Sequence, residues 1–320
     1  MSVSTQFLRT EYYRMGRPLR ILRKCNFFII LISYGICTEI PIIKSSTRIA
    51  FSAQTQGRNN KIPILKIVSQ FSSGIITERA TYRPVGEDST NLRLDTIIKY
   101  MYDPKTRRLQ DEQYLLFGRN LFALISYSYT PAGMTNEIVQ SNTEGSILRR
   151  TAYSWNNQNL LVNEKHYVLN NRLSYILFYQ YTPERNLSEE IKYNNQLKTE
   201  YTVRYSYNFQ GQRTEKKQYD ANNLLEYKII YRYNDDKLIK DYTHFGPDNM
   251  LESETTCDYE TVAGQRLLVS QTLKDNKGNV KSELLISYDS YGNEIIRAIY
   301  NYSGKKKELF QYFETVYEYE

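Results

Sequence analysis

The stretch VRYSYNFQGQRTEKKQYD, residues 203–220, combines a tyrosine pair, a glycine and a run of charged residues. Residues 229–244, IIYRYNDDKLIKDYTH, repeat this arrangement, with the tyrosine pair moved from 205 and 207 to 231 and 233. The first aromatic of the pair recurs at one spacing of 27 and then at a constant spacing of 26, and Cys257 fills the next slot: Tyr100, Tyr127, Tyr153, Tyr179, Tyr205 and Tyr231. A register held over so many units predicts a repeat architecture.

The second aromatic of each pair keeps the same register. It stands at Tyr102, Tyr129, Trp155, Tyr181, Tyr207, Tyr233 and Tyr259. Two less regular units follow, at Tyr288 and at TVYEYE near the end of the sequence. The repeat therefore extends over residues 96–320.

Each unit resolves into two strands. In the first strand the large side chains alternate with polar ones, so Tyr201, Val203, Tyr205 and Tyr207 are expected on one face. Because the period is an even number, the aromatic set stays on that face from unit to unit. Turn residues such as NFQG and TPAG separate this strand from a second, more polar one.

These features predict an all-β fold. We expect an extended antiparallel meander of ~26-residue two-strand repeats, with sixteen to eighteen strands after residue 95. Twist accumulates over so many strands, so the sheet should be twisted or wound into a β-solenoid or a shell-like sheet. Residues 38–95 are less regular, and KIPILKIVSQF and GIITERATY within them indicate N-terminal strands that form a cap.

The units resemble the tyrosine-rich YD repeats, or RHS-type repeats, of bacterial surface and secreted proteins. The similarity rests on YDSYGNEI at 288–295, YDANNLLEY at 219–227 and YNFQGQRTE at 207–215. In that family the strands wind into a hollow β-shell or spiral, and the resemblance implies such an architecture here. The period is longer in this chain and most units lack the aspartate or the glycine, so the family's encapsulating role is not carried over.

Residues 1–37 have the layout of a signal peptide. The segment RPLRILRKCNFFIILISYGICTEIP places basic residues before an apolar stretch, Phe27 to Cys37, that is short for a transmembrane helix. Met15 as the true start would give a leader of ordinary length. Cys37 is a candidate lipidation site, with ordinary signal-peptidase cleavage as the alternative. The segment predicts export to the periplasm, cell surface or extracellular space, and a buried apolar N-terminal segment is the other interpretation.

The distribution of charge and the number of cysteines exclude some classes of function. Residues 1–37 contribute a net charge of +5 to the total of +7, which leaves +2 (7 − 5) for the rest of the chain. A nucleic-acid surface needs clustered excess cations, so we expect no nucleic-acid partner. Cys25 and Cys37 belong to the leader, and Cys257 alone forms no internal disulfide.

No catalytic, cofactor or metal site is expected. His166 and His244 occupy comparable second-strand slots three repeat units apart, and a metal site would need more nitrogen or sulfur ligands. Acids recur at the start of the second strand, at Glu137, Glu164, Glu190, Glu215 and Asp241. Because they follow the repeat beside Lys and Arg, we interpret them as a solvated face with cross-strand ion pairs rather than as paired catalytic carboxylates.

The tyrosines remain as candidate ligand contacts. The paired tyrosines of the first strand should pack as the core of the sheet, since Val203 and Ile229 share their face. The second-strand tyrosines have charged neighbours and are expected to be partly exposed: Tyr167, Tyr193, Tyr219 and Tyr242. These rings could contact a sugar or an extended peptide through their flat faces.

The sequence thus predicts a non-enzymatic, exported bacterial repeat protein with a structural or binding role. Its partner would be a protein or glycan at the envelope or host surface, and contact with a membrane would come only through a lipid anchor. An outer-membrane β-barrel and a glycan-binding, adhesin-type lectin are the alternatives. Strands such as EEIKYN and TEKKQY lack the apolar face that a lipid-facing barrel needs.

Overall fold

The computed structural model describes residues 42–51, 63–85 and 91–319, which all belong to one unit, Ile42–Glu320. These residues form twenty strands joined by turns, and they contain no helix. In chain order the strands are β1 (Ile43–Phe51), β2 (Pro63–Ser72), β3 (Ile75–Pro84), β4 (Leu92–Tyr102), β5 (Leu109–Leu116), β6 (Asn120–Tyr129), β7 (Thr135–Ser141), β8 (Ile147–Trp155), β9 (Leu161–Val168), β10 (Arg172–Tyr181), β11 (Leu187–Asn194), β12 (Thr199–Tyr207), β13 (Arg213–Asp220), β14 (Leu225–Tyr233), β15 (Ile239–Phe245), β16 (Leu251–Val262), β17 (Gln265–Asp275), β18 (Val280–Tyr288), β19 (Glu294–Ser303) and β20 (Lys306–Tyr319).

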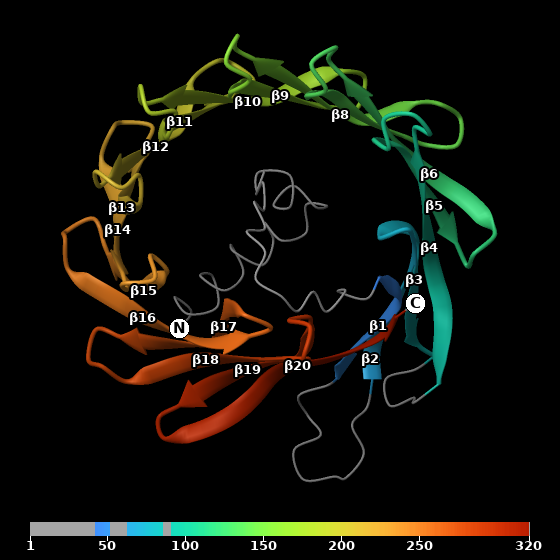
Figure 1. Ribbon diagram of the computed structural model, residues 1–320. Coiled ribbons are helices and arrows are strands. Elements are labelled where there is room, and N and C mark those ends of the chain that lie inside the picture. Colours follow the sequence, from blue (N-terminus) through green and yellow to red (C-terminus); the bar gives the residue numbers. More distant parts are fainter. Residues whose placement is uncertain (1–41, 52–62, 86–90, 320) are drawn as a thin grey trace, which may run out of the picture. The chain divides into compact units, whose positions relative to one another are not determined.

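The strands form a single antiparallel meander that closes on itself. Each strand pairs with the strands before and after it, and β1 pairs with β2 on one side and with β20 on the other. Thr47, for example, lies opposite Val68 of β2 and Val316 of β20. Figure 1 follows the strands in order from β1 in blue to β20 in red.

Closure corrects the expectation that the sheet winds into a β-solenoid. The all-β meander is confirmed, and β4 to β20 supply seventeen strands, within the expected range of sixteen to eighteen. The sequence pattern also located β2 and β3, but it did not reveal β1, which lacks the aromatic pair. Because β1 pairs with β20, the sheet has no free edge and forms a barrel. A closed sheet of this many strands is too wide for its own side chains to fill.

One face of the sheet carries the aromatic repeat, and we call it the tyrosine face. In the ladders, Tyr179 lies opposite Glu190, and Glu190 lies opposite Val203, so these three side chains share it. Its buried apolar residues are Tyr100, Tyr153, Leu177, Val203, Ile229, Cys257 and Ile299. The first aromatics therefore belong to the packed face, as the pattern predicted.

The turns explain the YD-like motif. In YDSYG, the Asp289 carboxylate accepts hydrogen bonds from the backbone N–H groups of Tyr291 and Asn293, at 2.9 and 2.8 Å. Gly292 has φ +86°, a left-handed conformation that suits glycine. Asp289 thus fixes the turn through its side chain.

A β-bulge accompanies the second aromatic of the pair. The register shifts between Ser206 and Tyr207 in the ladder from β12 to β13, and the same shift occurs next to Tyr129, Tyr181 and Tyr233. A bulge adds one residue to one strand and so changes which face the following residues occupy. Counting positions from the turn alone therefore misplaces second-strand side chains by one face.

Leu197 provides a test of the turn geometry. It adopts a left-handed conformation, φ +59°, at the turn between β11 and β12, and its side chain is exposed. Left-handed backbone is unfavourable for a residue with a Cβ atom, so Leu197→Gly should raise the free energy of unfolding by about 0.5–1 kcal/mol. Chemical denaturation measures this change.

Gly278 is the matched control because it occupies the same turn position between β17 and β18. Its φ is +80°, and a Cβ atom placed there would meet no atom within 4 Å. Gly278→Ala should therefore destabilise the protein by about 1 kcal/mol through the backbone alone. Equal stability of the two variants and the parent would contradict this account of the turns.

Candidate functional site

In seven units, from Tyr129 to Tyr288, the second aromatic is a structural lock rather than a binding group. Its side chain donates a hydrogen bond to the backbone carbonyl twenty residues earlier, at 2.6–2.9 Å. The donor and acceptor pairs are Tyr129 and Leu109, Trp155 and Thr135, Tyr181 and Leu161, Tyr207 and Leu187, Tyr233 and Arg213, Tyr259 and Ile239, and Tyr288 and Leu268. We call this contact the aromatic latch.

The latch provides a hydrogen-bond donor for a backbone carbonyl that lies outside the ladder between two strands. Leu187 begins β11, but the ladder between β11 and β12 starts only at Glu189 opposite Arg204. The Leu187 carbonyl therefore lies beyond the ladder, and the Tyr207 hydroxyl supplies its donor. The same offset occurs at Leu161, where the ladder to β10 ends at Asn163.

Tyr181→Phe should measure the strength of one latch. The substitution removes the hydroxyl that bonds the Leu161 carbonyl at 2.8 Å and leaves that carbonyl without its donor. We expect the free energy of unfolding to fall by about 1 kcal/mol in urea titrations. Tyr291→Phe is the control, because Tyr291 is 47% exposed and its hydroxyl is not a latch. A loss as large in the control as in Tyr181→Phe would refute the latch.

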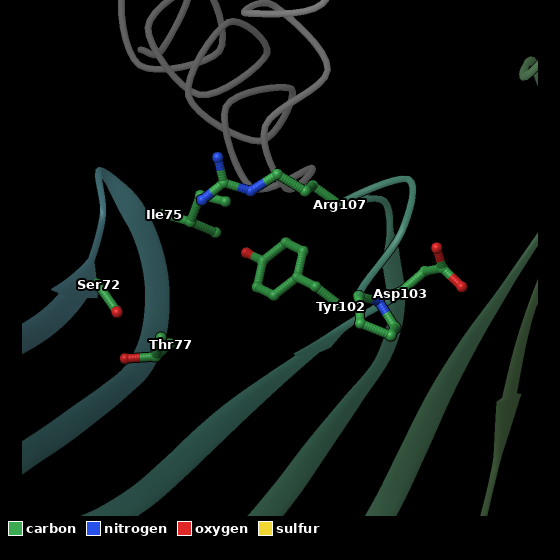
Figure 2. Close-up of a pocket in the computed structure, with 7 residues that line it drawn as sticks. Ser72, Ile75, Thr77, Tyr102, Asp103 and Arg107 are labelled. Carbon is green, nitrogen blue, oxygen red and sulfur yellow. The ribbon is translucent and has the colours of Figure 1, made fainter.

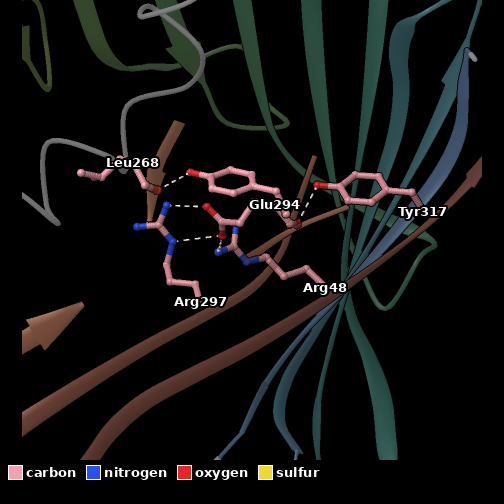
Figure 3. A network of polar contacts seen from close by, with 6 residues as sticks. Arg48, Leu268, Glu294, Arg297 and Tyr317 are labelled. Carbon is pink, nitrogen blue, oxygen red and sulfur yellow. Dashed lines mark hydrogen bonds and ion pairs between the residues drawn. The ribbon is translucent and has the colours of Figure 1, made fainter. Parts of the chain in front are cut away.

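Ion pairs reinforce the seam where the sheet closes. Arg48 of β1 reaches across β20 to Glu294 of β19, with 2.7 Å between Nη2 and Oε1. Arg297 binds the same carboxylate at 3.0 Å from Nε, and the Tyr317 hydroxyl donates to the Glu294 carbonyl at 3.2 Å. Figure 3 shows Glu294 between the two arginines. This network joins the first strand to the last two.

Buried glutamates lie on the tyrosine face. Glu112 is 1% exposed and accepts hydrogen bonds from the Tyr127 and Tyr114 hydroxyls at 2.7 and 2.8 Å. Glu164 is 3% exposed and accepts one from Tyr179 at 3.2 Å. Burial, together with the hydrogen bond and charge of Glu112, raises the pKa of the Tyr127 phenol far above its usual value. The Tyr127 phenol therefore remains a protonated donor.

The interpretation of the repeated acids as one solvated face is wrong for part of the set. Glu164 and Glu190 are buried on the tyrosine face, whereas Glu215 lies opposite Ser206 on the other face. The reason is an offset of one position, because 164 and 190 follow the register of the repeat while 215 stands one position earlier in it. Asp241 is on the second face but is also buried, paired with Arg232.

On the second face, Glu137 forms the expected cross-strand ion pair, with Arg150 of β8. Glu215 instead pairs with Lys217 of its own strand at 2.6 Å. Glu112, the most buried carboxylate, was missed in the sequence analysis. Its position two repeat periods before Glu164 is the signal that could have found it.

Glu112→Gln should destabilise the protein more than Glu215→Gln. The first substitution replaces one of the two buried acceptor oxygens by an NH₂ group, which would face one of the two phenol donors, so we expect a loss of about 1–3 kcal/mol. The second removes only a half-exposed ion pair, worth at most about 1 kcal/mol. Denaturant midpoints of the two variants measure the difference, and the reverse order would contradict the burial assigned to Glu112.

The two histidines make structural contacts. His166 stacks on Tyr175 with 4.2 Å between ring centroids, and its Nε2 lies 3.1 Å from Glu164 Oε2. His244 stacks on Tyr227 at 5.1 Å and contacts Glu252 at 2.8 Å. Burial lowers the pKa of His244 below its usual value despite the neighbouring Glu252 carboxylate.

Three of the predicted ligand tyrosines form a row on the second face. Tyr167, Tyr193 and Tyr219 are half-buried and stand one repeat period apart in the chain. Arg150 lies 4.8 Å from the Tyr167 ring centroid, and Arg204 lies 4.8 Å from that of Tyr219. Successive rings are separated by one intervening strand, or about 10 Å.

Tyr242 stands apart from this row. It lies opposite Tyr231 on the tyrosine face, with 6.0 Å between ring centroids. The position one repeat after Tyr219 is Phe245, whose ring lies 4.7 Å from the Lys228 ammonium. The structure thus brings Tyr167, Tyr193 and Tyr219 onto one face and places Tyr242 on the other.

A hollow of about 220 Å³ lies between the turn that joins β2 to β3 and the turn that joins β4 to β5. Figure 2 shows Tyr102 with its hydroxyl toward Ile75 and Arg107 beside it. The Asp103 carboxylate accepts backbone hydrogen bonds from Thr106 and Lys105 at 2.6 and 3.1 Å, which lowers its pKa. This acid is occupied in fixing its own turn.

Within the described ranges, no group of His, Cys, Asp and Glu side chains is arranged to hold a metal ion. The same residues include no helix long and apolar enough to cross a membrane. The predicted signal peptide, residues 1–37, lies outside the described residues, as do Met15, Cys25 and the candidate lipidation site Cys37.

No family model and no curated protein matches the chain. Among solved structures, the crystal structure of TcdB2-TccC3-Cdc42 is similar at 9% identity with a TM-score of 0.34, and the match covers 76% of this chain and 16% of that chain. A porin-like protein from Bacteroides uniformis ATCC 8492 is similar at 10% identity with a TM-score of 0.36, covering 86% of this chain and 96% of that chain.

A second porin-like protein, from Bacteroides vulgatus ATCC 8482, is similar at 8% identity with a TM-score of 0.25. It covers 87% of this chain and 99% of that chain. The chain therefore spans a small part of the TcdB2-TccC3-Cdc42 chain and nearly the full length of the two porin-like proteins. These similarities assign neither a family nor a function to this chain.

Proposed function

We propose that the protein is a non-enzymatic, exported bacterial repeat protein whose closed sheet serves as a structural element or binding surface. The observation that carries this proposal is the presence of charged groups on both faces of the sheet. The second face carries Arg204 bound to Glu189 at 2.9 Å, and the tyrosine face carries Glu164 and Lys216. Such faces suit contact with water or with a polar partner.

An outer-membrane β-barrel is the second candidate. An even number of antiparallel strands in a closed sheet favours it. However, a lipid-facing barrel needs a continuous apolar band, and a charge at the bilayer midplane costs about 2–4 kcal/mol. Arg232, which binds both Asp241 and Glu254, lies on the second face, and the buried glutamates lie on the tyrosine face. Both surfaces therefore disfavour immersion in lipid.

The half-exposed row Tyr167, Tyr193 and Tyr219 supports a ligand-binding role, because rings about 10 Å apart can each contact an extended chain. The ligand would be a glycan or an extended protein segment at the envelope or host surface. The YD-like motif, with Asp289 and Gly292 in the roles that the turn requires, supports a relationship to YD repeat proteins.

Cell fractionation tests the proposal against the barrel. We expect the native protein to be released from envelope fractions by alkaline carbonate, because neither face of its sheet is apolar enough to hold it in lipid. A lipid-embedded barrel would stay in the pellet until detergent is added. Retention after carbonate, with no lipid attached to Cys37 by mass spectrometry, would overturn the proposal.

Glycan and peptide arrays probed with the purified chain test the binding row. Replacement of Tyr167, Tyr193 and Tyr219 by alanine should reduce binding at least about tenfold if each ring contributes stacking of roughly 0.5–1.5 kcal/mol. Tyr291→Ala, an exposed tyrosine outside the row, is the matched control. Unchanged binding by the triple variant would remove the row from the proposed function.

A further inference from the structure

Arg213 is a charged residue at a position of the repeat that holds an uncharged residue in the other units. It begins β13 and offers its carbonyl to the Tyr233 latch at 2.8 Å. The equivalent latch acceptors are Leu109, Thr135, Leu161, Leu187, Ile239 and Leu268. The guanidinium is thus an exception in a position where the fold requires only a backbone carbonyl.

A second slot on the same face changes charge in the same unit. Lys216 stands where earlier units place the buried carboxylates Glu112, Glu164 and Glu190. In two of those units, the first aromatic of the following strand donates its hydroxyl to the carboxylate: Tyr127 to Glu112 and Tyr179 to Glu164. Tyr231 holds that position relative to Lys216.

The two cations lie on the tyrosine face, and each of them contacts an aromatic ring. Arg213 lies opposite Tyr207, and Lys216 lies opposite Tyr205, because the bulge keeps both on the tyrosine face. The Arg213 Cζ atom is 4.6 Å from the Tyr205 ring centroid. The Lys216 ammonium lies 5.4 Å from the Tyr227 ring centroid. Aromatic rings therefore line the space around both positive groups.

The charge of Arg213 faces phenol oxygens rather than a carboxylate. Its Nε is shut off from solvent and has no hydrogen-bond partner, and no carboxylate among the described residues forms an ion pair with it. Burial opposes the charged form, but the oxygens of Tyr207, Tyr231 and Tyr205 raise the pKa of Arg213 overall. A cation that stays charged in a partly buried environment of low dielectric constant attracts an anion more strongly than a cation in water does.

We propose that Arg213 and Lys216, framed by Tyr205 and Tyr231, form a binding site for an oxyanion, which takes the place of the carboxylate that Glu112, Glu164 and Glu190 supply in other units. The planar guanidinium matches the paired oxygens of a phosphate or carboxylate group. The ammonium of Lys216 adds a second positive charge on the same face. This site goes beyond the proposed function, and its test uses purified protein without reference to export.

Two variants restore the repeat pattern and remove the site. Arg213→Leu installs the residue found at Leu161 and Leu187, and Lys216→Glu installs the residue found at Glu164. Both variants match slots that fold in neighbouring units. Lys217→Gln is the control, because Lys217 is on the second face and pairs with Glu215 at 2.6 Å.

The measurement is the thermal midpoint of the full chain as chloride is replaced by inorganic phosphate, or separately by acetate, at constant ionic strength. Calorimetric titration with phosphate gives the affinity directly. We expect a saturating rise and a single site in the parent and in Lys217→Gln. Arg213→Leu and Lys216→Glu should weaken phosphate binding at least about tenfold. A response to phosphate alone identifies a phosphate site, and a response to both anions identifies a general oxyanion site.

An equal, non-saturating rise in all four proteins would overturn the proposal, because phosphate stabilises folded proteins generally through exclusion from their surface. Phosphate binding that persists unchanged in Arg213→Leu would overturn it as well. Stabilisation of Arg213→Leu without any anion response in the parent would overturn it too, because the guanidinium would then be only a desolvation cost with no bound anion.

Discussion

Pairing of β1 with β20 is the constraint on which the rest of the structure depends. A meander of this length with two free ends would expose two rows of unpaired backbone groups, which are open to association with other strands. Here Thr47 lies between Val68 and Val316, so the first strand satisfies both ends of the ladder. The ion pair between Arg48 and Glu294 spans the same seam and fixes its register through side chains. Closure thus converts an extendable array into a barrel of fixed size.

Within that barrel, the bulge and the latch act together. The bulge opposite Tyr181 lies at Leu187, and the ladder between β11 and β12 begins only at Glu189, so the Leu187 carbonyl falls outside that ladder. An aromatic donor is long enough to reach that carbonyl, whereas a serine or threonine at the same position is too short. Trp155 in place of a tyrosine donates its indole N–H to Thr135 in the same geometry, so the requirement is for a long donor rather than for tyrosine as such. This explains why the second aromatic keeps so strict a spacing in the sequence.

Local physics made much of the fold predictable from the sequence. The alternation of large and polar side chains located the strands, and the even period placed Tyr179, Val203 and Ile229 on one face. Closure was not predictable, because it depends on a pairing between residues as distant as Ile43 and Tyr319, and β1 carries no aromatic pair. The bulge was not predictable from the sequence pattern either, so the face on which each second-strand residue lies could not be assigned. Tyr242 was grouped with Tyr219 on composition, although the two positions are separated by less than one full repeat period.

Because the same position recurs in every unit, a repeat makes it easier to tell residues that the fold requires from residues that serve a function. A side chain that recurs in every unit, such as the latch aromatic, is explained by the needs of the sheet, and its chemistry requires no ligand. A side chain that departs from its slot contributes nothing to the common scaffold and often opposes it, since an arginine in a leucine position carries a desolvation cost. Arg213 and Lys216 depart together, in one unit and on one face. Two departures of the same sign on one face favour an anion there, because each adds to the positive potential that an anion would meet.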